Sequence, residues 1–176
     1  GGRTLAEAVL AMRAEIASLQ RQMGTTTVYV THDQVEAMTM GHRVAVLRLG
    51  ELQQVAPPQD LYDNPDNVFV AGFIGTPPMT LFHAGLTIED NGARLKVGPQ
   101  EIWVPSEVLD LRPSLREKNN QEVIVGVRAE DIHYEAREGL TPLQATVVLA
   151  EALGSSVHVT FALEGTPVDE ARLGSG

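Results

Sequence analysis

A glycine- and proline-rich break near the middle of the chain constrains the fold more than any other feature of the sequence. Residues 75–78 read Gly-Thr-Pro-Pro, and this run cannot continue a helix because proline lacks a backbone N–H and restricts the residue before it. Helical and strand-like patterns alternate before the break, whereas short strand-like runs dominate after it. The sequence therefore predicts an α/β domain over residues 1–75 and an all-β domain over residues 76–176, joined by a linker.

Composition excludes several classes of protein. The chain of 176 residues carries 23 acidic and 13 basic side chains, a net charge of −10, and such a chain repels the phosphates of nucleic acids. The absence of cysteine excludes disulfides, thiolate metal sites and cysteine nucleophiles. No apolar stretch approaches the roughly 20 residues that cross a bilayer, and the N-terminal residues do not form a signal peptide. These features predict a soluble intracellular protein that binds no nucleic acid.

Before the break, the patterns predict a helix, a strand and a second helix. Apolar residues three and four positions apart over residues 5–23 predict an amphipathic helix lying on a sheet. The β-branched run over residues 25–31 predicts a short buried strand. Asp33 and Glu36, three positions apart, predict a capping box that begins a second helix, which Gly41 ends.

The remainder of the first domain is predicted to hold one hairpin and two short helices. Two strand-like runs around a Leu-Gly turn predict a β-hairpin over residues 43–55. A proline at the first helical position predicts a short helix over residues 58–62, and an apolar run predicts another over residues 68–74.

After the break, short strands are predicted, with an excursion that contains some helix over residues 105–117. An Asn-Gly pair between the first two of these strands is a strong hairpin signal. Several short strands at such spacing are typical of a small barrel or sandwich. The strands are predicted over residues 83–88, 93–97, 100–104, 123–128, 143–149 and 157–163.

His32 occupies the position at which α/β proteins bind ligands. It follows the predicted strand and comes just before the predicted second helix, and ligands in α/β sheets lie beyond strand ends and beside helix N-termini. Taken alone, such a histidine more often caps a strand–helix junction than acts directly in function. The other four histidines stand in or beside strands or turns, without the HxH or HExxH spacing of a metal site: His42, His83, His133 and His158.

The sequence around His32 resembles a known family. Residues 27–38, Thr-Val-Tyr-Val-Thr-His-Asp-Gln-Val-Glu-Ala-Met, closely resemble the switch segment of the ATP-binding subunits of ATP-binding cassette (ABC) importers. The resemblance extends over residues 12–82 and is to the subgroup that energises uptake of maltose, trehalose, other oligosaccharides or glycerol phosphate. Further landmarks of that subgroup follow in order at residues 43–47, Gly50, Gln54, Pro57, 61–62, Pro65 and 69–75.

The resemblance implies a role for His32 in phosphoryl transfer. In the family, this histidine contacts the γ-phosphate of ATP and helps to position the attacking water, so His32 is the expected catalytic and cofactor-binding residue. The intact protein is expected to use ATP and Mg²⁺. Its expected partners are a second copy of the ATPase subunit and the transmembrane permease subunits. Its expected location is the cytoplasm, peripheral on the inner face of the cell membrane.

Three motifs of the family are absent from the sequence. It has no G-x-x-x-x-G-K-[ST] phosphate loop (Walker A), no signature motif and no apolar strand ending in Asp-Glu (Walker B). In these importers all three lie earlier in the sequence than the switch histidine. The resemblance therefore implies the C-terminal half of such a subunit. This fragment is expected to hydrolyse no ATP and to bind no cofactor by itself.

The second half of the sequence resembles the accessory domain of the same subunits. Residues 125–132, Val-Gly-Val-Arg-Ala-Glu-Asp-Ile, resemble the G-[IV]-R-P-E motif of their oligonucleotide-binding-like (OB-like) domain of the TOBE type, with Ala129 in place of the proline. Residues 151–154 match in place as well. The resemblance implies a dimerisation and regulatory domain on which a regulatory protein can dock. This domain is expected to be truncated and open at one edge.

A second function is left open by the sequence. The chain can instead be a non-enzymatic regulatory or ligand-binding module built on the OB-like domain. OB-like folds also host oligonucleotide binders, but this half is acidic and its Trp103 is expected in the core rather than on a stacking surface. The length of the native gene product separates the two hypotheses.

Overall fold

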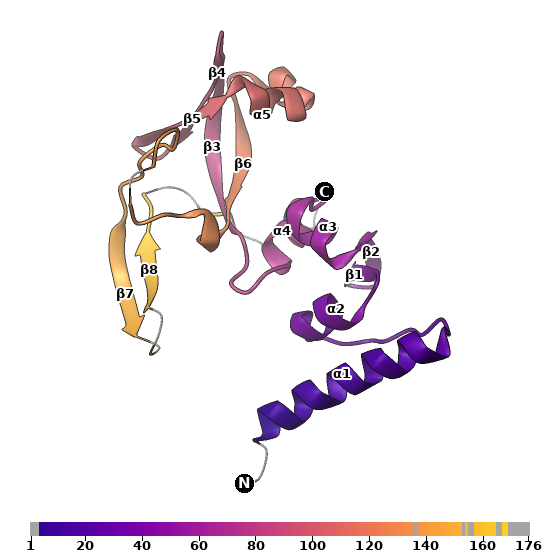
Figure 1. Ribbon diagram of the computed structural model, residues 1–176. Helices are drawn as coiled ribbons and strands as arrows, with labels where there is room; N and C mark the ends of the chain where they lie inside the picture. The colour runs from indigo at the N-terminus through magenta and orange to yellow at the C-terminus, as the bar shows by residue number, and fades with distance from the viewer. Residues whose placement is uncertain (1–3, 136, 153, 155–156, 165–166, 169–176) are drawn as a thin grey trace. The chain divides into compact units, whose positions relative to one another are not determined.

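The computed structural model describes residues 4–168 apart from 136, 153, 155–156 and 165–166. The chain forms two compact units, Gly1–Pro78 and Met79–Gly176 (Figure 1). The first unit mixes helices with a two-stranded sheet, whereas the second is built mainly from strands, so the chain combines an α/β part with an all-β part. Within the described residues, no helix has the length and apolar character needed to cross a membrane.

The long first helix, α1 (Leu5–Met23), has the span that the apolar spacing predicts. Thr4 and Glu7 form a capping box at its start: the Thr4 hydroxyl accepts a hydrogen bond from the Glu7 N–H, and the Glu7 carboxylate accepts one from the Thr4 N–H. Gly24 ends the helix at a φ of 61°, in the left-handed region that glycine adopts without steric cost.

The apolar face of α1 is not covered by a sheet. Met12, Leu19 and Met23 keep 51%, 49% and 68% of their surface exposed, and the main contact of the helix is with α2 (Gln34–Met40). The prediction that this helix lies on a sheet is therefore wrong for the described residues. The physical reason is that the named strands of the first unit form only a two-stranded hairpin, which offers no broad face for a helix.

Residues 25–31 follow an extended path back along α1 but form no strand (Figure 1). Val28 and Val30 are 87% and 89% exposed, so the prediction of a buried strand is wrong here. β-Branched residues favour an extended backbone, but a strand also needs a neighbour that exchanges backbone hydrogen bonds with it. No described segment of the chain is such a neighbour for residues 25–31.

The first unit continues with the hairpin predicted around the Leu-Gly turn. Strand β1 (Val44–Arg48) pairs antiparallel with β2 (Glu51–Ala56). Leu49 and Gly50 connect them with φ angles of 49° and 86°. Two positive φ angles are typical of the two-residue turn whose twist matches that of the paired strands.

Two short helices complete the first unit, α3 (Pro58–Asp63) and α4 (Val68–Phe73), both where the sequence predicts them. The side-chain amide of buried Gln54 donates to the Asn64 carbonyl at 3.0 Å and accepts from the Asp66 N–H at 2.9 Å. Two polar backbone groups between the two helices thereby have hydrogen-bond partners. The core of the unit consists of buried side chains from β1, α3 and the end of α4: Val46, Leu61, Val70 and Ile74.

The second unit is built on a four-stranded antiparallel sheet with the strand order β5-β4-β3-β6. Its long strand β3 (Thr80–Glu89) pairs through its first half with β6 (Gln121–Val127) and through its second half with β4 (Gly92–Val97). Strand β5 (Gln100–Pro105) pairs with β4. The hairpin predicted from the Asn-Gly pair is confirmed, because Asn91 lies in the turn between β3 and β4.

Helical turns between β5 and β6 pack on this sheet. The predicted excursion consists of helix α5 (Ser106–Leu111) and the 3-10 helix η1 (Pro113–Lys118). Leu109 of α5 is 1% exposed and packs against Leu86 and Ala93 of the sheet. A second buried cluster joins Phe82, Ala84 and Val97.

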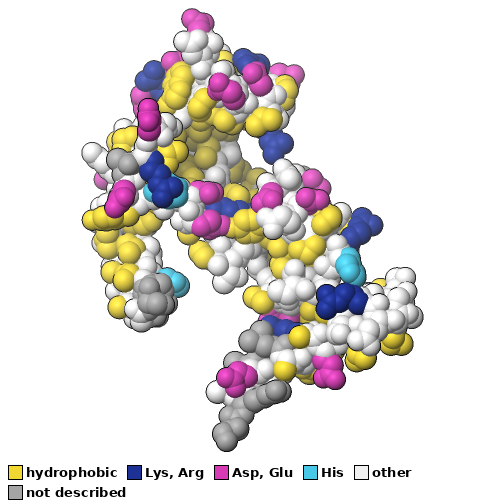
Figure 2. Space-filling view, in the orientation of Figure 1, with side chains coloured by type: hydrophobic (Ala, Val, Ile, Leu, Met, Phe, Trp, Pro, Cys, Tyr) yellow, Lys and Arg dark blue, Asp and Glu magenta, His cyan; other side chains and the backbone are white. Residues whose placement is uncertain are grey.

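The last two strands form a sheet of their own. After the short 3-10 helix η2 (Ala129–Asp131), strand β7 (Thr146–Ala152) pairs only with β8 (Val157–Ala162). Their apolar side chains are largely exposed, and Figure 2 shows them gathered on this hairpin. Strand β8 lies where the sequence predicts it and β7 begins three residues later than predicted, and within the described residues they do not close into a barrel.

The chain returns to β3 after this hairpin. Phe82 forms an isolated bridge with Pro167, and the Val168 N–H donates to the Leu81 carbonyl at 3.1 Å. These contacts lie on the first half of β3, which β4 leaves free because it pairs only with the second half. The first half of β3 is therefore flanked on both sides.

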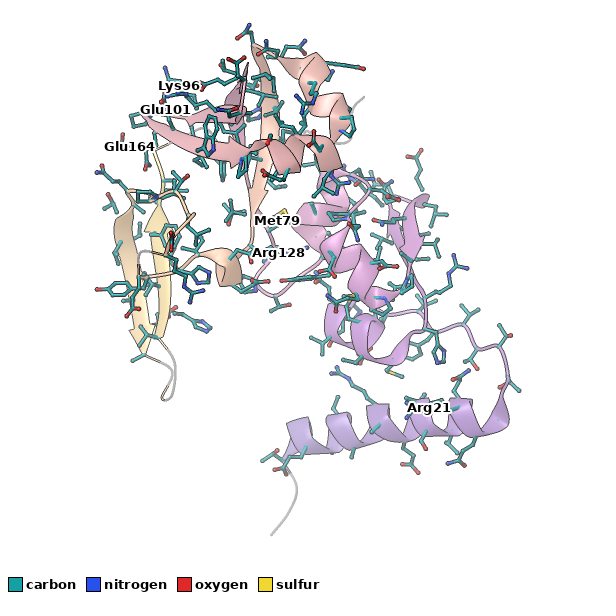
Figure 3. All side chains as sticks on the ribbon, turned by 45° about the horizontal axis from the view of Figure 1, so that its top comes forward. Arg21, Met79, Lys96, Glu101, Arg128 and Glu164 are labelled. Atoms are coloured by element: carbon teal, nitrogen blue, oxygen red, sulfur yellow. The ribbon has the colours of Figure 1, made fainter. Side chains whose placement is uncertain are left out.

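Two glycines of the sheet lie in close contact with other residues, and at Gly92 the neighbour is backbone, which cannot move aside. A Cβ added at Gly92 would lie 2.3 Å from the Val104 carbonyl oxygen and 2.7 Å from the Trp103 ring. A Cβ added at Gly126 would lie 2.1 Å from the sulfur of Met79, the first residue of this unit (Figure 3). Trp103 itself is 41% exposed, so the expectation that it lies in the core is wrong; it covers the backbone of Gly92 instead.

Candidate functional site

His32 lies at a bend between the extended segment and helix α2, and its side chain is exposed. Asp33 follows it as the N-cap of α2: its Oδ1 accepts from the N–H groups of Val35 at 2.8 Å and Glu36 at 3.2 Å. The Asp33 N–H donates to the Thr31 Oγ1 at 2.9 Å. The residues on both sides of His32 are therefore held by hydrogen bonds.

The predicted capping box forms only in part. Asp33 caps the helix, and Gly41 ends it, as the sequence predicts. In a complete box the Glu36 carboxylate would also accept from the Asp33 N–H, but the Thr31 hydroxyl takes that hydrogen bond instead. The Glu36 side chain is thereby left to bind groups from other parts of the unit.

Glu36 is the centre of a network that joins α1, the extended segment and α2. Its Oε2 accepts from the Thr31 Oγ1 at 2.6 Å and from the Tyr29 hydroxyl at 3.1 Å. Its Oε1 accepts from Arg13 of α1, from Nε at 3.2 Å and from Nη2 at 3.0 Å. The same Nη2 lies 2.8 Å from the Asp33 Oδ2, so one guanidinium bridges both carboxylates. We call these five residues the Glu36 network.

The residues that lead to His32 alternate between two faces. Val28, Val30 and His32 are exposed, and the three residues that alternate with them belong to the Glu36 network. This is the period of two that an extended backbone imposes on its side chains. His32 therefore projects from the face that the network leaves open.

Hydrogen bonds within the Glu36 network change the pKa values of its acidic groups. The pKa of Glu36 is lowered, chiefly because the Thr31 hydroxyl donates to its carboxylate, and Arg13 and Tyr29 add to this effect against that of burial. The pKa of Asp33 is lowered, chiefly because the Glu36 N–H donates to it. The pKa of Tyr29 is raised, because its hydroxyl donates to the Glu36 carboxylate. At neutral pH both carboxylates are therefore ionised and the phenol is protonated.

Gln34 fixes the other side of the bend. Its side-chain Nε2 donates to the Phe73 carbonyl at the end of α4, and its Oε1 accepts from the Gly75 N–H at 3.0 Å. The first turn of α2 is thus joined to α4 through a side-chain amide. The Glu36 network and the Gln34 amide together fix the bend against two helices of the same unit.

The remaining histidines do not join His32. His83 in β3 pairs with Glu122, with 2.8 Å between its Nδ1 and a carboxylate oxygen, and the ring of His133 lies 3.1 Å from the Arg137 guanidinium. In the part of the chain that the structure describes, no group of three or more His, Asp or Glu side chains could hold a metal ion. The candidate site in the described residues therefore rests on His32.

Sequence reasoning selected His32 as the site residue and gave Asp33 and Glu36 only a capping role, but it missed Arg13, Thr31 and Tyr29. Two signals in the sequence pointed to them. Arg13 stands beside the apolar stripe of its helix, and the hydroxyl-bearing residues alternate with valines in the β-branched run. Neither signal predicts that α1 approaches α2, which is a tertiary contact between residues 20 and 23 positions apart.

Comparison with known proteins shows what this chain is similar to. The TOBE domain family matches residues 125–175. Over most of its length the chain is homologous to the C-terminal region of the ATP-binding subunits of carbohydrate-import ABC transporters, and its second half carries the TOBE domain.

Three curated relatives represent this match. The trehalose/maltose import ATP-binding protein MalK of Thermococcus litoralis is 44% identical over 94% of this chain and 46% of its own length. The trehalose import ATP-binding protein SugC of Mycobacterium tuberculosis is 45% identical over 92% of this chain and 41% of its own length. The oligosaccharides import ATP-binding protein MsmX of Bacillus subtilis is 42% identical over 84% of this chain and 40% of its own length. The chain therefore spans less than half the length of these relatives.

Proposed function

We propose that this chain is part of the ATP-hydrolysing subunit that energises carbohydrate import through an ABC transporter. In this proposal residues 1–75 are the C-terminal part of the nucleotide-binding domain, and residues 76–176 form the OB-like regulatory and dimerisation domain. The imported compound belongs to the class of sugars, oligosaccharides and glycerol phosphate. Similarity to import ATP-binding proteins over 84–94% of the chain supports the assignment.

In the intact subunit His32 contacts the γ-phosphate of ATP. The observation that carries this role is the exposed imidazole at a bend whose two neighbours, Thr31 and Asp33, are both hydrogen-bonded in place. Phosphoryl transfer depends mainly on the positioning of groups and on the stabilisation of charge. A hydrogen-bond donor on a fixed bend meets both requirements.

ATP and Mg²⁺ bind mainly to parts of the intact subunit outside these 176 residues. The described residues offer no cluster of carboxylates or histidines that could hold Mg²⁺, and the sequence has no glycine-rich loop and lysine for the phosphates. The residues present therefore fit one contact to the nucleotide, that of His32, and do not fit a magnesium site. The 176-residue chain alone is expected to hydrolyse no ATP and to need no cofactor.

The partners proposed for the intact subunit are a second copy of itself and the transmembrane permease subunits. A regulatory protein docking on the second unit is a further proposed partner, and nucleic acid is not, because the chain has a net charge of −10. The proposed location is the cytoplasmic face of the cell membrane, where a permease subunit would hold the protein as a peripheral component.

The alternative is a non-enzymatic regulatory or ligand-binding module built on the OB-like domain. It is favoured by one observation, the absence of a phosphate loop from the sequence. In this alternative His32 is structural, and the second unit carries the function.

The mass of the native protein in its source separates these two functions, measured by immunoblot against the 176-residue chain. A product about twice as long with a phosphate loop supports the ATPase. In that product His32→Ala is expected to lower ATP turnover to a small but measurable residual rate, while His42→Ala, which removes another exposed histidine of the first unit, leaves it unchanged. A native product of this size, or full turnover by the His32→Ala protein, would contradict the proposal.

A further inference from the structure

We infer that Arg13 is a positioning residue for His32: by bridging Asp33 and Glu36 it fixes the face from which His32 projects. The inference rests on the proposed contact between His32 and the γ-phosphate. It assigns a role to a side chain of α1 that lies 19 positions before His32 in the sequence and does not itself reach the nucleotide in this proposal. The role follows from the contacts of the Glu36 network.

The Glu36 network fixes which side chains of the residues around His32 point to each face. In a sheet, the ladder of backbone hydrogen bonds has this effect. Here side-chain contacts have it as well, because the network contains Tyr29, Thr31 and Asp33, every second residue from 29 to 33. A rearrangement by one residue would turn His32 inward and Thr31 outward.

Arg13 holds this arrangement together because its positive charge lies between two carboxylates and attracts both. Asp33 and Glu36 both approach the same Nη2, at 2.8 Å and 3.0 Å, and without the guanidinium the two negative charges would repel each other. The side chains of Arg13 and Glu36 are each only 16% exposed, so the ion pair is partly shielded from water and salt. Loss of the positive charge is therefore expected to loosen the bend, although the cap of α2 and the Gln34 amide still hold it.

Arginine supplies a geometry that lysine cannot. Nε and Nη2 of Arg13 both donate to one oxygen of Glu36, and Nη2 also donates to Asp33. The planar guanidinium presents these donors in a fixed arrangement, whereas an ammonium is a single point charge. Arg13→Lys is therefore expected to keep only part of the ATP turnover that is lost in Arg13→Met.

The first test measures ATP turnover by the full-length protein that contains this chain. Arg13→Met is expected to lower kcat on the order of ten- to a hundredfold with little change in KM, because a group misplaced by about 1 Å costs rate rather than ground-state binding. The matched control is Arg21→Met, which removes another arginine of α1 (Figure 3) that has no ion pair among the described residues. The control is expected to turn over ATP at the unmodified rate.

A double mutant separates positioning from a general loss of structure. If Arg13 acts through His32, Arg13→Met has no further effect on turnover once His32→Ala is present. A further loss in the double mutant, or full turnover by Arg13→Met, would overturn the inference. Full turnover by His32→Ala alone would instead overturn the proposed function, so the two failures are distinguishable.

A second measurement is independent of activity. Amide hydrogen exchange of Asp33, Val35 and Glu36 reports the bend and the cap directly, because these three N–H groups donate within it. Arg13→Met is expected to speed their exchange at least tenfold and Arg21→Met to leave it unchanged. If Arg13→Met does not fold, Arg13→Lys supports the same test, since it keeps the positive charge but lacks the planar set of donors that contacts Asp33 and Glu36. Unchanged exchange in both variants would overturn the inference.

Discussion

At the scale of single residues, the carboxylate of Glu36 is surrounded by hydrogen-bond donors. It accepts hydrogen bonds on both carboxylate oxygens, from Tyr29, Thr31 and Arg13. All of these donors bind the ionised carboxylate better than the protonated one, which is why its pKa is lowered. The network therefore depends on pH through the charge of Glu36 and of its neighbour Asp33.

Replacing Glu36 by glutamine is expected to lower the free energy of unfolding of the first unit at neutral pH and to flatten its pH dependence. Folding lowers the pKa of Glu36 below its ordinary value of 4.5. The carboxylate therefore stabilises the folded unit above pH 4.5, and this stabilisation is lost as the pH falls through the lowered value. Glutamine has no such proton to bind. Urea unfolding followed by circular dichroism at several values between about pH 7 and about pH 3 measures the difference.

The control for this experiment is Glu15→Gln. Glu15 is exposed on α1 and has no ion pair within the described part of the chain, so its removal is expected to leave the pH dependence as it is. Parallel curves for Glu36→Gln and the unmodified protein would contradict the prediction.

At the scale of elements, the sheet of the second unit contains two glycines with opposite requirements. A Cβ at Gly92 would lie 2.3 Å from a backbone oxygen of β5, which cannot move without breaking the β4–β5 pairing. A Cβ at Gly85 would meet only the Cβ of Lys96 at 3.9 Å, an ordinary contact. The first position needs glycine because two backbones come close, and the second has room for a side chain.

Gly92→Ala is therefore expected to lower the free energy of unfolding of the second unit by about 1–3 kcal/mol, the usual cost of forcing extra atoms into a packed position. Gly85→Ala is the matched control and is expected to be neutral or stabilising, because alanine loses less backbone entropy in a strand than glycine does. Thermal unfolding of the two variants beside the unmodified protein tests the difference. Equal melting temperatures for both variants would contradict the prediction.

Elements defined by local chemistry were predictable from the sequence. The bounds of α1 follow from its apolar spacing and Gly24, and the β1–β2 hairpin follows from a Leu-Gly pair between two strand-like runs. Residues 25–31 were not predictable in this way, because whether an extended run becomes a strand depends on a neighbour that its own composition does not specify. The same reason explains why six strands were found in the second unit but not their separation into two sheets.

The candidate site shows the same division. His32 was predictable because the chain changes from a β-branched run to a helix cap at that position. The role of Arg13 was not, because it arises only when α1 packs on α2. Local patterns thus identify the candidate residue His32, whereas the side chains that contact its neighbours depend on the tertiary fold.

At the scale of the whole molecule, the chain has separate hydrophobic cores. Among the residues that the structure describes, the first unit has one buried cluster around Leu61 and Val70, and the second has clusters around Phe82 and Leu109. None of these clusters takes residues from both units. Units with separate cores are expected to unfold in separate cooperative transitions.

Two unfolding transitions are therefore expected in differential scanning calorimetry of the chain. Glu36→Gln is expected to shift one of them and Gly92→Ala the other, because each substitution lies within one unit. Each variant is the control for the other, because a substitution in one unit is expected to leave the transition of the other unit unchanged. A single transition that both substitutions shift equally would contradict the prediction.

The amide of Gln34 has a mechanical consequence. It donates to the Phe73 carbonyl and accepts from the Gly75 N–H. Both residues lie shortly before the proline pair at which the first unit ends. A displacement of the bend at His32 is therefore expected to stretch these two hydrogen bonds, so the end of the first unit restrains the bend as directly as the neighbouring residues of α2 do.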